Sequence, residues 1–555
     1  MNISKRAFIS HIYFQQVHAK VIWSYLALLL SAFSYADPSQ GFDVKAHLSH
    51  SVSSQSTLYN PEAVIPSQCY TKTEGEYNPC YACHQFSSPG HVNRMDDGEL
   101  QGSYDFSDIG VTNHWVNLFE DRRPRIAKTT DKQIQDYINQ DNYTSLASNL
   151  KKRNWQGWIP DLENLELGPE AFDEMGFAKD GSDWVTYNYS PLPSTFWPTN
   201  GSTDDVMIRL PQSFRLDEKG NYNRDIYLLN LSIVEAAIKN FRVISIPDMD
   251  EKKLGLDLDG DGHLTIATQL KRPKFYLGKA SDIKVQTNLY PKSTEFLHTV
   301  RYVGVDEETG EIFNPKRMKE VRYMVKTKAI RKSTLGNFYA EEQQDKFEGN
   351  LPRYPTLGDK GIDNKFGWLL SGFIEDAEGE LRPQVYEEQL FCMGCHTTIG
   401  SIVDSTFSFS RKPDGAAGWG YIDLKDMSDV PTYGENEGAV KAYLRRVGGG
   451  NEFRINEEMQ TRFFNTNGSL NEEALKSTMT LYDIIAPSVE RAMKLNKAYK
   501  TIVEDQDFIF GRDANIAPAD NVYKEINTEI PPLEPEFRHS SDIRLNWSEK
   551  QQTIR

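Results

Sequence analysis

The sequence predicts a mixed α and β fold, in which mainly helical, loop-rich regions at both ends enclose a β-rich middle segment. Apolar residues recur at helical spacing near 130–141 and 227–238, and again in the last third of the chain. Short runs rich in β-branched and aromatic residues follow one another from 241 to 328. The chain has 555 residues, of which 39% are apolar and 12% aromatic, so it can form several folded domains.

The first 36 residues are predicted to be a cleaved secretory signal peptide of the Sec type. Three Lys or Arg residues and no acidic residue precede position 37, an apolar segment covers 21–33, and a small-x-small site ends at Ala36. The alternative is an uncleaved membrane anchor, for which the apolar segment is short. Because no cysteine stands at the cleavage site, a lipoprotein is not expected. We expect a periplasmic protein without stable membrane insertion after cleavage.

Three regions follow the signal peptide (residues 1–36). They are an N-terminal region over 37–239, a β-rich middle over 240–345 and a C-terminal domain over 346–555. In the first region, Thr130 and Gln133 fit a capping box, which predicts a helix over about 130–141. Aromatic and proline residues crowd 155–198, which predicts packed loops, and 227–238 carries a second helical stripe.

The middle region and the end of the chain have recognisable strand and helix boundaries. Six short strands are predicted, from FRVISI at 241–246 to EVRYMVKTK at 320–328, with a hairpin turn at 306–310. A run of three glycines ends a predicted helix over 436–446, and Pro487 begins another. The change from helical to strand periodicity and back is the basis of the predicted fold class.

The charge of the chain limits its partners. The formal net charge is −17, and loss of the signal peptide leaves 59 basic and 79 acidic residues, a net charge of −20. Contacts to phosphate groups need clustered Lys and Arg, so no binding to nucleic acid is expected. An acidic protein is instead attracted to partners with basic surfaces.

Two segments share the spacing Cys-x-x-Cys-His, which is typical of covalent haem attachment. The first motif is Cys80, Cys83 and His84, and the second motif is Cys392, Cys395 and His396. Two thiols at this spacing can form thioether bonds with the two vinyl groups of one haem, and the histidine that follows can bind the iron. Zinc ligation and a redox-active thiol pair are the alternatives, but they leave the adjacent histidines unexplained. The motifs predict two covalently bound haem c groups.

In these motifs, their flanking segments and the signal peptide, the sequence resembles the dihaem c-type cytochromes. The flanking segments are EYNPCYACHQF and EEQLFCMGCHTTIG. The resemblance covers a small part of the chain. It implies that the loop-rich regions at both ends bind haem, and that the protein moves electrons between redox partners, which would carry basic docking patches.

A second function remains open at this point. In a dihaem oxidoreductase, such as a peroxidase-like enzyme, one haem keeps an open coordination position at which a substrate can react. The long chain between the two motifs could provide a substrate pocket. The sequence alone does not decide whether the protein is an enzyme.

A low-spin haem iron needs a sixth ligand, usually from His or Met. His114 and His298 are the candidates, because they lie among apolar and aromatic residues. For each of them the alternative is a hydrogen-bonded core histidine. Met427 follows His396 by 31 residues and is the substitute ligand at the second haem.

Cys69 is the one cysteine outside the two motifs. A free buried thiol, a thiolate ligand to a haem and an intermolecular disulfide are all compatible with its position.

An acidic segment over 257–265 matches the first half of an EF-hand calcium loop. Its candidate ligands are the carboxylates of Asp257, Asp259 and Asp261 and the backbone carbonyl of His263. The twelfth position is Thr268 rather than Glu, so the usual closing ligand is missing, and Asp248 or Asp250 is the candidate substitute from outside the loop. A solvated acidic turn is the alternative. The expected Ca²⁺ would be structural, at the entry to the β-rich middle.

Overall fold

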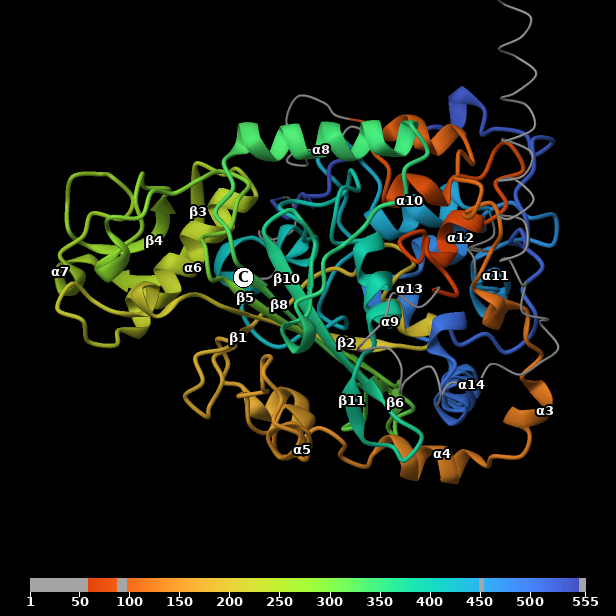
Figure 1. Ribbon diagram of the computed structural model, residues 1–555. Helices are drawn as coiled ribbons and strands as arrows, with labels where there is room; N and C mark the ends of the chain where they lie inside the picture. Colours follow the sequence, from red (N-terminus) through yellow and green to blue (C-terminus); the bar gives the residue numbers. More distant parts are fainter. Residues whose placement is uncertain (1–57, 87–96, 449–453, 549–555) are drawn as a thin grey trace, which may run out of the picture. The chain divides into compact units, whose positions relative to one another are not determined.

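The computed structural model describes residues 58–86, 97–448 and 454–548 (Figure 1). The predicted signal peptide lies outside the described residues. Within these ranges, no helix combines the length and the apolar character that crossing a membrane requires.

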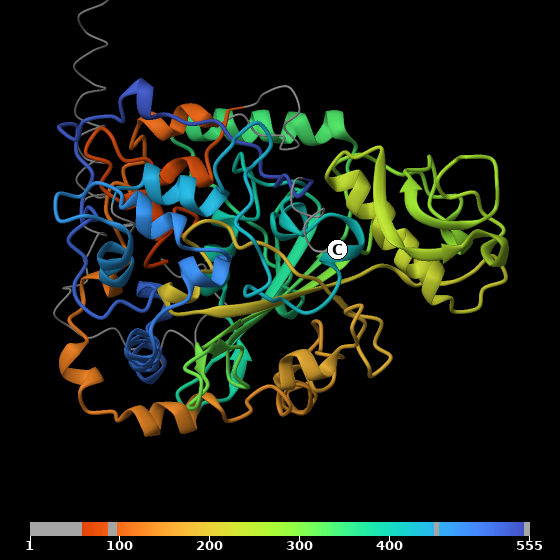
Figure 2. The same cartoon turned by 180° about the vertical axis from the view of Figure 1, so that it is seen from behind.

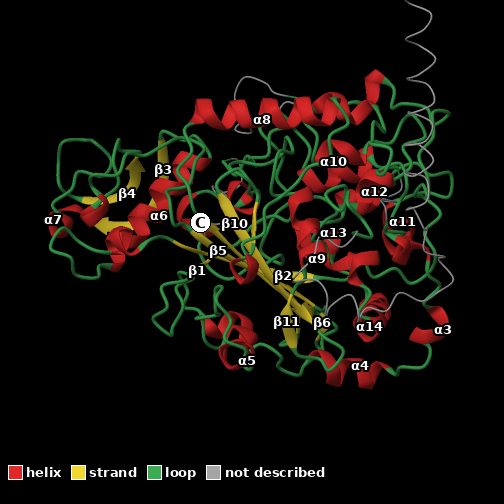
Figure 3. Cartoon of the chain, in the orientation of Figure 1, coloured by secondary structure: helices red, strands yellow, loops and turns green. Residues whose placement is uncertain are grey.

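A seven-stranded antiparallel sheet forms the centre of the fold (Figure 3). Across the sheet, the strands are β1 (Val185–Thr186), β2 (Thr203–Arg209), β5 (Glu295–Arg301), β8 (Met318–Lys326), β10 (Trp368–Glu375) and β11 (Leu381–Pro383). A short strand, β9 (Ile362–Asp363), also pairs with β10. In the register of β2, β5 and β8, His298 lies opposite Val206 on one side and Arg322 on the other. This row of three residues crosses the face of the sheet that forms the candidate site.

The sheet corrects the predicted fold class, because the ends of the chain are not mainly helical. Its strands come from all three predicted regions: β2 from the first, β5 and β8 from the middle, and β10 from the last. Strand β2 is buried at all seven positions, so its sequence lacks the alternation that marks a half-exposed strand. Two of those positions are Asp204 and Asp205. Because both residues are charged, the hydrophobic pattern of the sequence does not indicate a buried strand here.

Short helices surround the sheet. In the N-terminal half of the chain they are α3 (Arg123–Ile126), α4 (Asp131–Ile138), α5 (Leu146–Lys152), α6 (Arg224–Ile238) and α7 (Glu251–Leu254). In the C-terminal half they are α8 (Lys332–Phe347), α9 (Tyr386–Leu390), α10 (Ala439–Arg446), α11 (Glu457–Phe463), α12 (Glu472–Lys476), α13 (Leu481–Ile485) and α14 (Val489–Asp505). The predicted capping box is present in α4, where Thr130 and Gln133 bond to each other's backbone N–H groups. The predicted helices near 227–238, 436–446 and after Pro487 correspond to α6, α10 and α14.

The predicted strands of the middle region divide among three sheets. The segment FRVISI starts β3 (Val243–Asp250), which pairs with β4 (Ile266–Lys271) in a separate two-stranded sheet beside α6 (Figure 2). Strands β6 (Gly304–Val305) and β7 (Ile312–Phe313) form the hairpin whose turn was predicted at 306–310. The predicted strands at 274–278 and 282–290 are wrong: apart from one isolated bridge between Phe275 and Lys284, these segments are loops.

Candidate functional site

The two Cys-x-x-Cys-His motifs adopt the same local structure. The first motif begins within a 3-10 turn over Pro79–Ala82, and the second begins within a 3-10 turn over Phe391–Gly394 that continues α9. In each motif, the carbonyl oxygen of the first cysteine accepts hydrogen bonds from the N–H groups of the second cysteine and the histidine, over 2.8–3.2 Å. This single tight turn gathers two thiols and an imidazole, although the motifs share only their three defining residues.

The two motifs lie beside each other, although 312 residues separate Cys80 from Cys392. The N–H of Ser401 donates a 3.0 Å hydrogen bond to the carbonyl oxygen of Cys83. The Cys395 thiol is also close enough to contribute, after burial, to the raised pKa of Cys83. The fold therefore makes one composite site from segments near opposite ends of the chain.

Both motif histidines have one ring nitrogen fixed by an acceptor. Nδ1 of His84 donates to the Asp97 carboxylate over 2.9 Å, and Nδ1 of His396 donates to the carbonyl oxygen of Ser405 over 2.8 Å. These bonds select the tautomer in which Nε2 carries the lone pair. A metal-binding histidine is commonly held in this way. The donor set of each motif, two thiols and a free imidazole Nε2, fits an attached haem.

A cavity opens beside the second motif, and one face of the central sheet forms its floor. Alternate residues of β5 and β8 line it, as expected for side chains on one face of a strand: Phe296, His298, Val300, Glu320, Arg322 and Met324. Cys392, Cys395 and His396 line the opposite part of the cavity. Burial, with smaller contributions from the charges of Arg322 and His298, lowers the pKa of His396 to about 4. His298 and His396 thus share one cavity.

His298 is the predicted iron ligand that the structure brings to a motif. Its Nε2 lies 3.1 Å from the carboxylate of Asp204 on β2, and the hydroxyl of Tyr189 donates to the same carboxylate. The ring of Phe196 meets the His298 ring edge-on, at 5.1 Å between centroids. Carboxylate support of this kind is common for histidines that bind metal.

The two other candidate ligands lie elsewhere. Nδ1 of His114 bonds to the carbonyl oxygen of Thr112, and its ring contacts Tyr59 rather than the cavity. Met427 is buried in a hydrophobic cluster that includes Tyr81 of the first motif. It is absent from the cavity wall beside the second motif, where it was expected to substitute for a histidine.

The cysteines carry neutral thiols. Burial raises the pKa of Cys80 to about 12 and that of Cys395 to about 11, and it also raises those of Cys83 and Cys392. Redox-active cysteine pairs have lowered pKa values instead. In the described part of the chain, Glu251, Asp257 and Asp259 are the only group of three or more potential metal-binding side chains that converge. Neither a thiol redox pair nor a zinc site is favoured.

Cys69 lies close to both motifs. Burial raises the pKa of its thiol, and Cys80 and Cys395 raise it further. The thiol forms no disulfide in the structure. This environment matches the first of the three alternatives, a free neutral thiol.

The acidic loop has the shape expected for a cation site, with one change in its residues. Carboxylate oxygens of Asp257 and Asp259 converge with that of Glu251, the first residue of α7, within 4.8 Å of one another. Asp261 and His263 are outside this group. Glu251 accepts hydrogen bonds from the N–H groups of Leu258 and Thr265, over 2.6 and 2.8 Å, so it holds both ends of the loop. Glu251 precedes the motif, and the EF-hand pattern gave no reason to include it.

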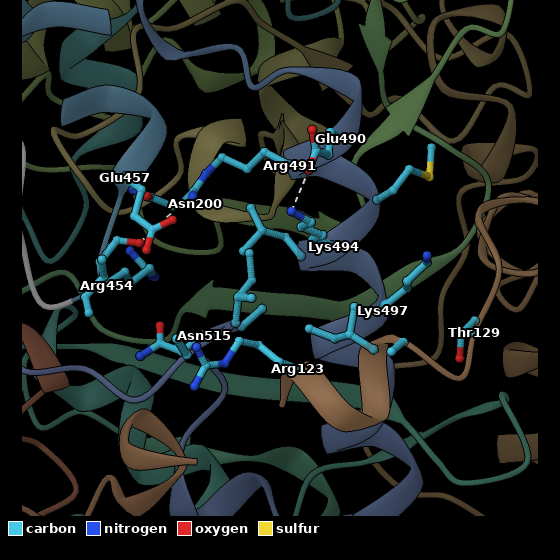
Figure 4. A pocket seen from close by; sticks show the side chains of 18 of the residues that line it. Arg123, Thr129, Asn200, Arg454, Glu457, Glu490, Arg491, Lys494, Lys497 and Asn515 are labelled. Atoms are coloured by element: carbon cyan, nitrogen blue, oxygen red, sulfur yellow. Dashed lines mark hydrogen bonds and ion pairs between the residues drawn. The ribbon is translucent and has the colours of Figure 1, made fainter. Parts of the chain in front are cut away.

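A second, more open cavity of about 850 Å³ lies between α14 and the segments around α3 and α11 (Figure 4). Its basic side chains are paired: Lys494 with Glu490, and Lys497 with Asp131. Arg454 lines both this cavity and the one beside the second motif, and it donates to the Asp513 carboxylate over 2.6 Å. The Arg454–Asp513 pair therefore lies where the two cavities approach each other.

Three residues that support the motifs could not be found from the sequence pattern. Asp97, Asp204 and Ser405 each hold a histidine, but each is an ordinary polar residue at a spacing that no motif specifies. Of the three, only Ser405 lies close in the sequence to the histidine that it holds, nine residues after His396.

The comparisons with known proteins give a family and no function. A family model with the description "-like lipoprotein" matches residues 53–480. An "Uncharacterized lipoprotein" of Aquifex aeolicus (strain VF5) is 31% identical over 513 residues, which cover 82% of this chain and 86% of the relative. No solved structure matches.

These matches correct two expectations. The assignment to the dihaem c-type cytochromes is wrong as a statement of family, because the matching family and the matching relative are both described as lipoproteins. The expectation that the chain is not a lipoprotein is overturned by the same finding. A lipoprotein family indicates a protein exported from the cytoplasm, so the prediction of export is confirmed. The more specific location in the periplasm stays a prediction.

Proposed function

This chain belongs to the family described as "-like lipoprotein", and from that premise we propose that it is an exported protein with two covalently bound haem c groups. One haem would be attached to the first motif and the other to the second. The protein would transfer electrons between redox partners in the periplasm. The acidic chain, with a formal net charge of −17, favours partners with basic docking patches.

One observation carries the proposal. Two segments with the same attachment spacing adopt the same turn, have neutral thiols, and hold their histidines so that Nε2 is directed to a ligand. A chance match of sequence letters would not reproduce these three features twice. The haem groups would supply one-electron redox chemistry at the iron. The chain attaches them, positions the axial imidazoles and keeps both sites close together.

At the second motif, His298 is the proposed sixth ligand. It lies on the cavity floor, its ring is fixed by Asp204 and Phe196, and it influences the pKa of His396 across the same cavity. Arg322 and Arg512 also line this cavity, and both bond to Glu320. Guanidinium groups in such a position could pair with the propionates of a haem.

The test is direct detection of covalent haem in the exported protein. Intact mass should exceed the polypeptide mass by two haems, and the colour should stay with the protein after extraction with acidified acetone. Replacing Cys392 and Cys395 by Ala should remove one haem, as should replacing Cys80 and Cys83. Cys69→Ala is the matched control, and it should retain both haems. Release of all colour into the acetone would contradict the proposal.

A dihaem oxidoreductase is the second candidate, and the cavities favour it in one respect. Arg454 borders both the cavity of the second motif and the cavity beside α14, so a displacement of this side chain would connect the two cavities for a small substrate. An open coordination position would give the oxidised protein a high-spin absorption band. Entirely low-spin spectra would instead support the electron-transfer function.

A further inference from the structure

The carboxylate of Asp97 connects the two motifs. Its Oδ2 accepts a hydrogen bond from Nδ1 of His84 over 2.9 Å and another from the N–H of Gly400 over 3.0 Å. Its Oδ1 accepts from the N–H of Gln85 over 3.1 Å. Only 6% of the side chain is exposed. One buried carboxylate thus bonds the histidine of the first motif and the backbone four residues after His396.

Position 400 must be glycine for this contact to form. A Cβ atom there would lie 2.2 Å from Oδ1 of Asp97 and 2.9 Å from the backbone nitrogen of Gln85. Cβ atoms essentially never come within 3.0 Å of another heavy atom in folded proteins, so a larger residue at position 400 would displace the carboxylate. The close approach of Asp97 therefore depends on a glycine, Gly400, in the segment that follows the second motif.

We propose that Asp97 is a positioning residue that sets the reduction potential of the haem on the first motif, and that Gly400 holds it in place from the second motif. This inference rests on the proposed function, because it requires that both haems be attached. It adds a residue outside both motifs and a physical connection between the two sites.

The electrostatic reason gives the direction of the effect. A negative carboxylate that accepts the Nδ1–H of an axial imidazole makes the ring a stronger donor to the iron. In a buried site this negative charge interacts strongly with the iron, and it stabilises the more positive, oxidised state. Asp97 should therefore lower the potential of the first haem. At the second motif the acceptor is the neutral carbonyl of Ser405, which lacks this charge.

The experiment is a spectroelectrochemical titration of the full-length protein and four variants. The transition that moves in His298→Ala identifies the second haem. In Asp97→Asn the other transition should shift to higher potential, because the acceptor keeps its shape and loses its charge. Gly400→Ala should shift the same transition in the same direction. The fourth variant, Gly336→Ala, is the control, because a Cβ at position 336 of α8 meets no atom within 4 Å.

Each outcome supports or overturns the inference. A shift of the first transition in Gly400→Ala, with two haems still attached and none in Gly336→Ala, supports it even if Asp97→Asn does not fold. Two attached haems with unchanged potentials in both Asp97→Asn and Gly400→Ala overturn it and leave the proposed function intact. Absence of covalent haem in the parent protein overturns both proposals together.

Discussion

The first and second motifs have the same backbone turn but different surroundings. His84 is partly exposed, at 19% of its side chain, and its Nδ1 donates to the carboxylate of Asp97. His396 lines a cavity, and its Nδ1 donates to the neutral carbonyl of Ser405. His298 lies across that cavity from His396. A five-residue motif can specify attachment, but residues distant in the sequence determine the chemistry of each site.

The comparison predicts different redox behaviour for the two sites. If haem is bound as proposed, the carboxylate beside the first site would favour the oxidised iron. Arg322 and Arg512, which line the cavity of the second site, would favour the reduced iron there. An electron should therefore move from the first site to the second.

Removing His298 should change the second site most. In His298→Ala the iron at the second motif should lose its sixth ligand, and the oxidised protein should gain a high-spin signal in optical and electron paramagnetic resonance spectra. His114→Ala is the matched control, because His114 contacts Tyr59 and does not line the cavity. Identical spectra for the parent and both variants would show that His298 is an ordinary core histidine.

The second site should also depend on a buried ion pair. Lys326 and Asp404 are at most 1% exposed and bond to each other, and Asp404 precedes the residue whose carbonyl holds His396. Asp404→Asn removes the negative charge of this buried pair, so the free energy of unfolding should fall by about 3 kcal/mol in denaturant titrations. Asp136→Asn removes an exposed i,i+4 pair with Lys132 and should cost about 0.5 kcal/mol or less. Equal losses would refute the role of burial.

Much of the local structure could be predicted from the sequence, because its signals are local. The capping box of α4 and the two attachment motifs each depend on residues within five positions of one another. Strand β2 could not be predicted, because its aspartates are neutralised by partners about 95 positions away, such as Arg301 for Asp205. His298 could be chosen as a candidate ligand from its apolar neighbours in the sequence. Asp204, which orients it, could not, because it lies 94 positions away.

Ionic strength should distinguish the two sites by their access to a partner. The partly exposed first site should receive electrons from a basic protein, attracted by the net charge of the chain. Raising the salt concentration from 0.01 to 0.1 M shortens the screening length from about 30 to about 10 Å. Stopped-flow rates of reduction by a basic partner should therefore fall, while rates with a small neutral reductant should not. A flat response to salt would show that the docking surface is neutral.

The calcium-like loop should have the smallest effect, and it should affect neither site. Asp257 and Asp259 converge with Glu251 in the connection between β3 and β4. Millimolar Ca²⁺ should raise the melting temperature by a few degrees, and Asp257→Asn should abolish that increase. Both reduction potentials should be unchanged by chelation. A shift in either reduction potential would mean that the distant loop also contributes to the difference in potential between the two sites.

The hydrogen bond from Ser401 to Cys83 has a consequence for how the protein is made. The segment that closes the first motif is 318 positions further along the chain than Cys83. At roughly 5–20 residues per second, synthesis delivers it on the order of 15–60 s later. Until that later segment is in place, Cys80 and Cys83 lack the neighbour that Ser401 provides. If haem is attached as proposed, it would reach the first motif most easily before the segment after the second motif closes over it.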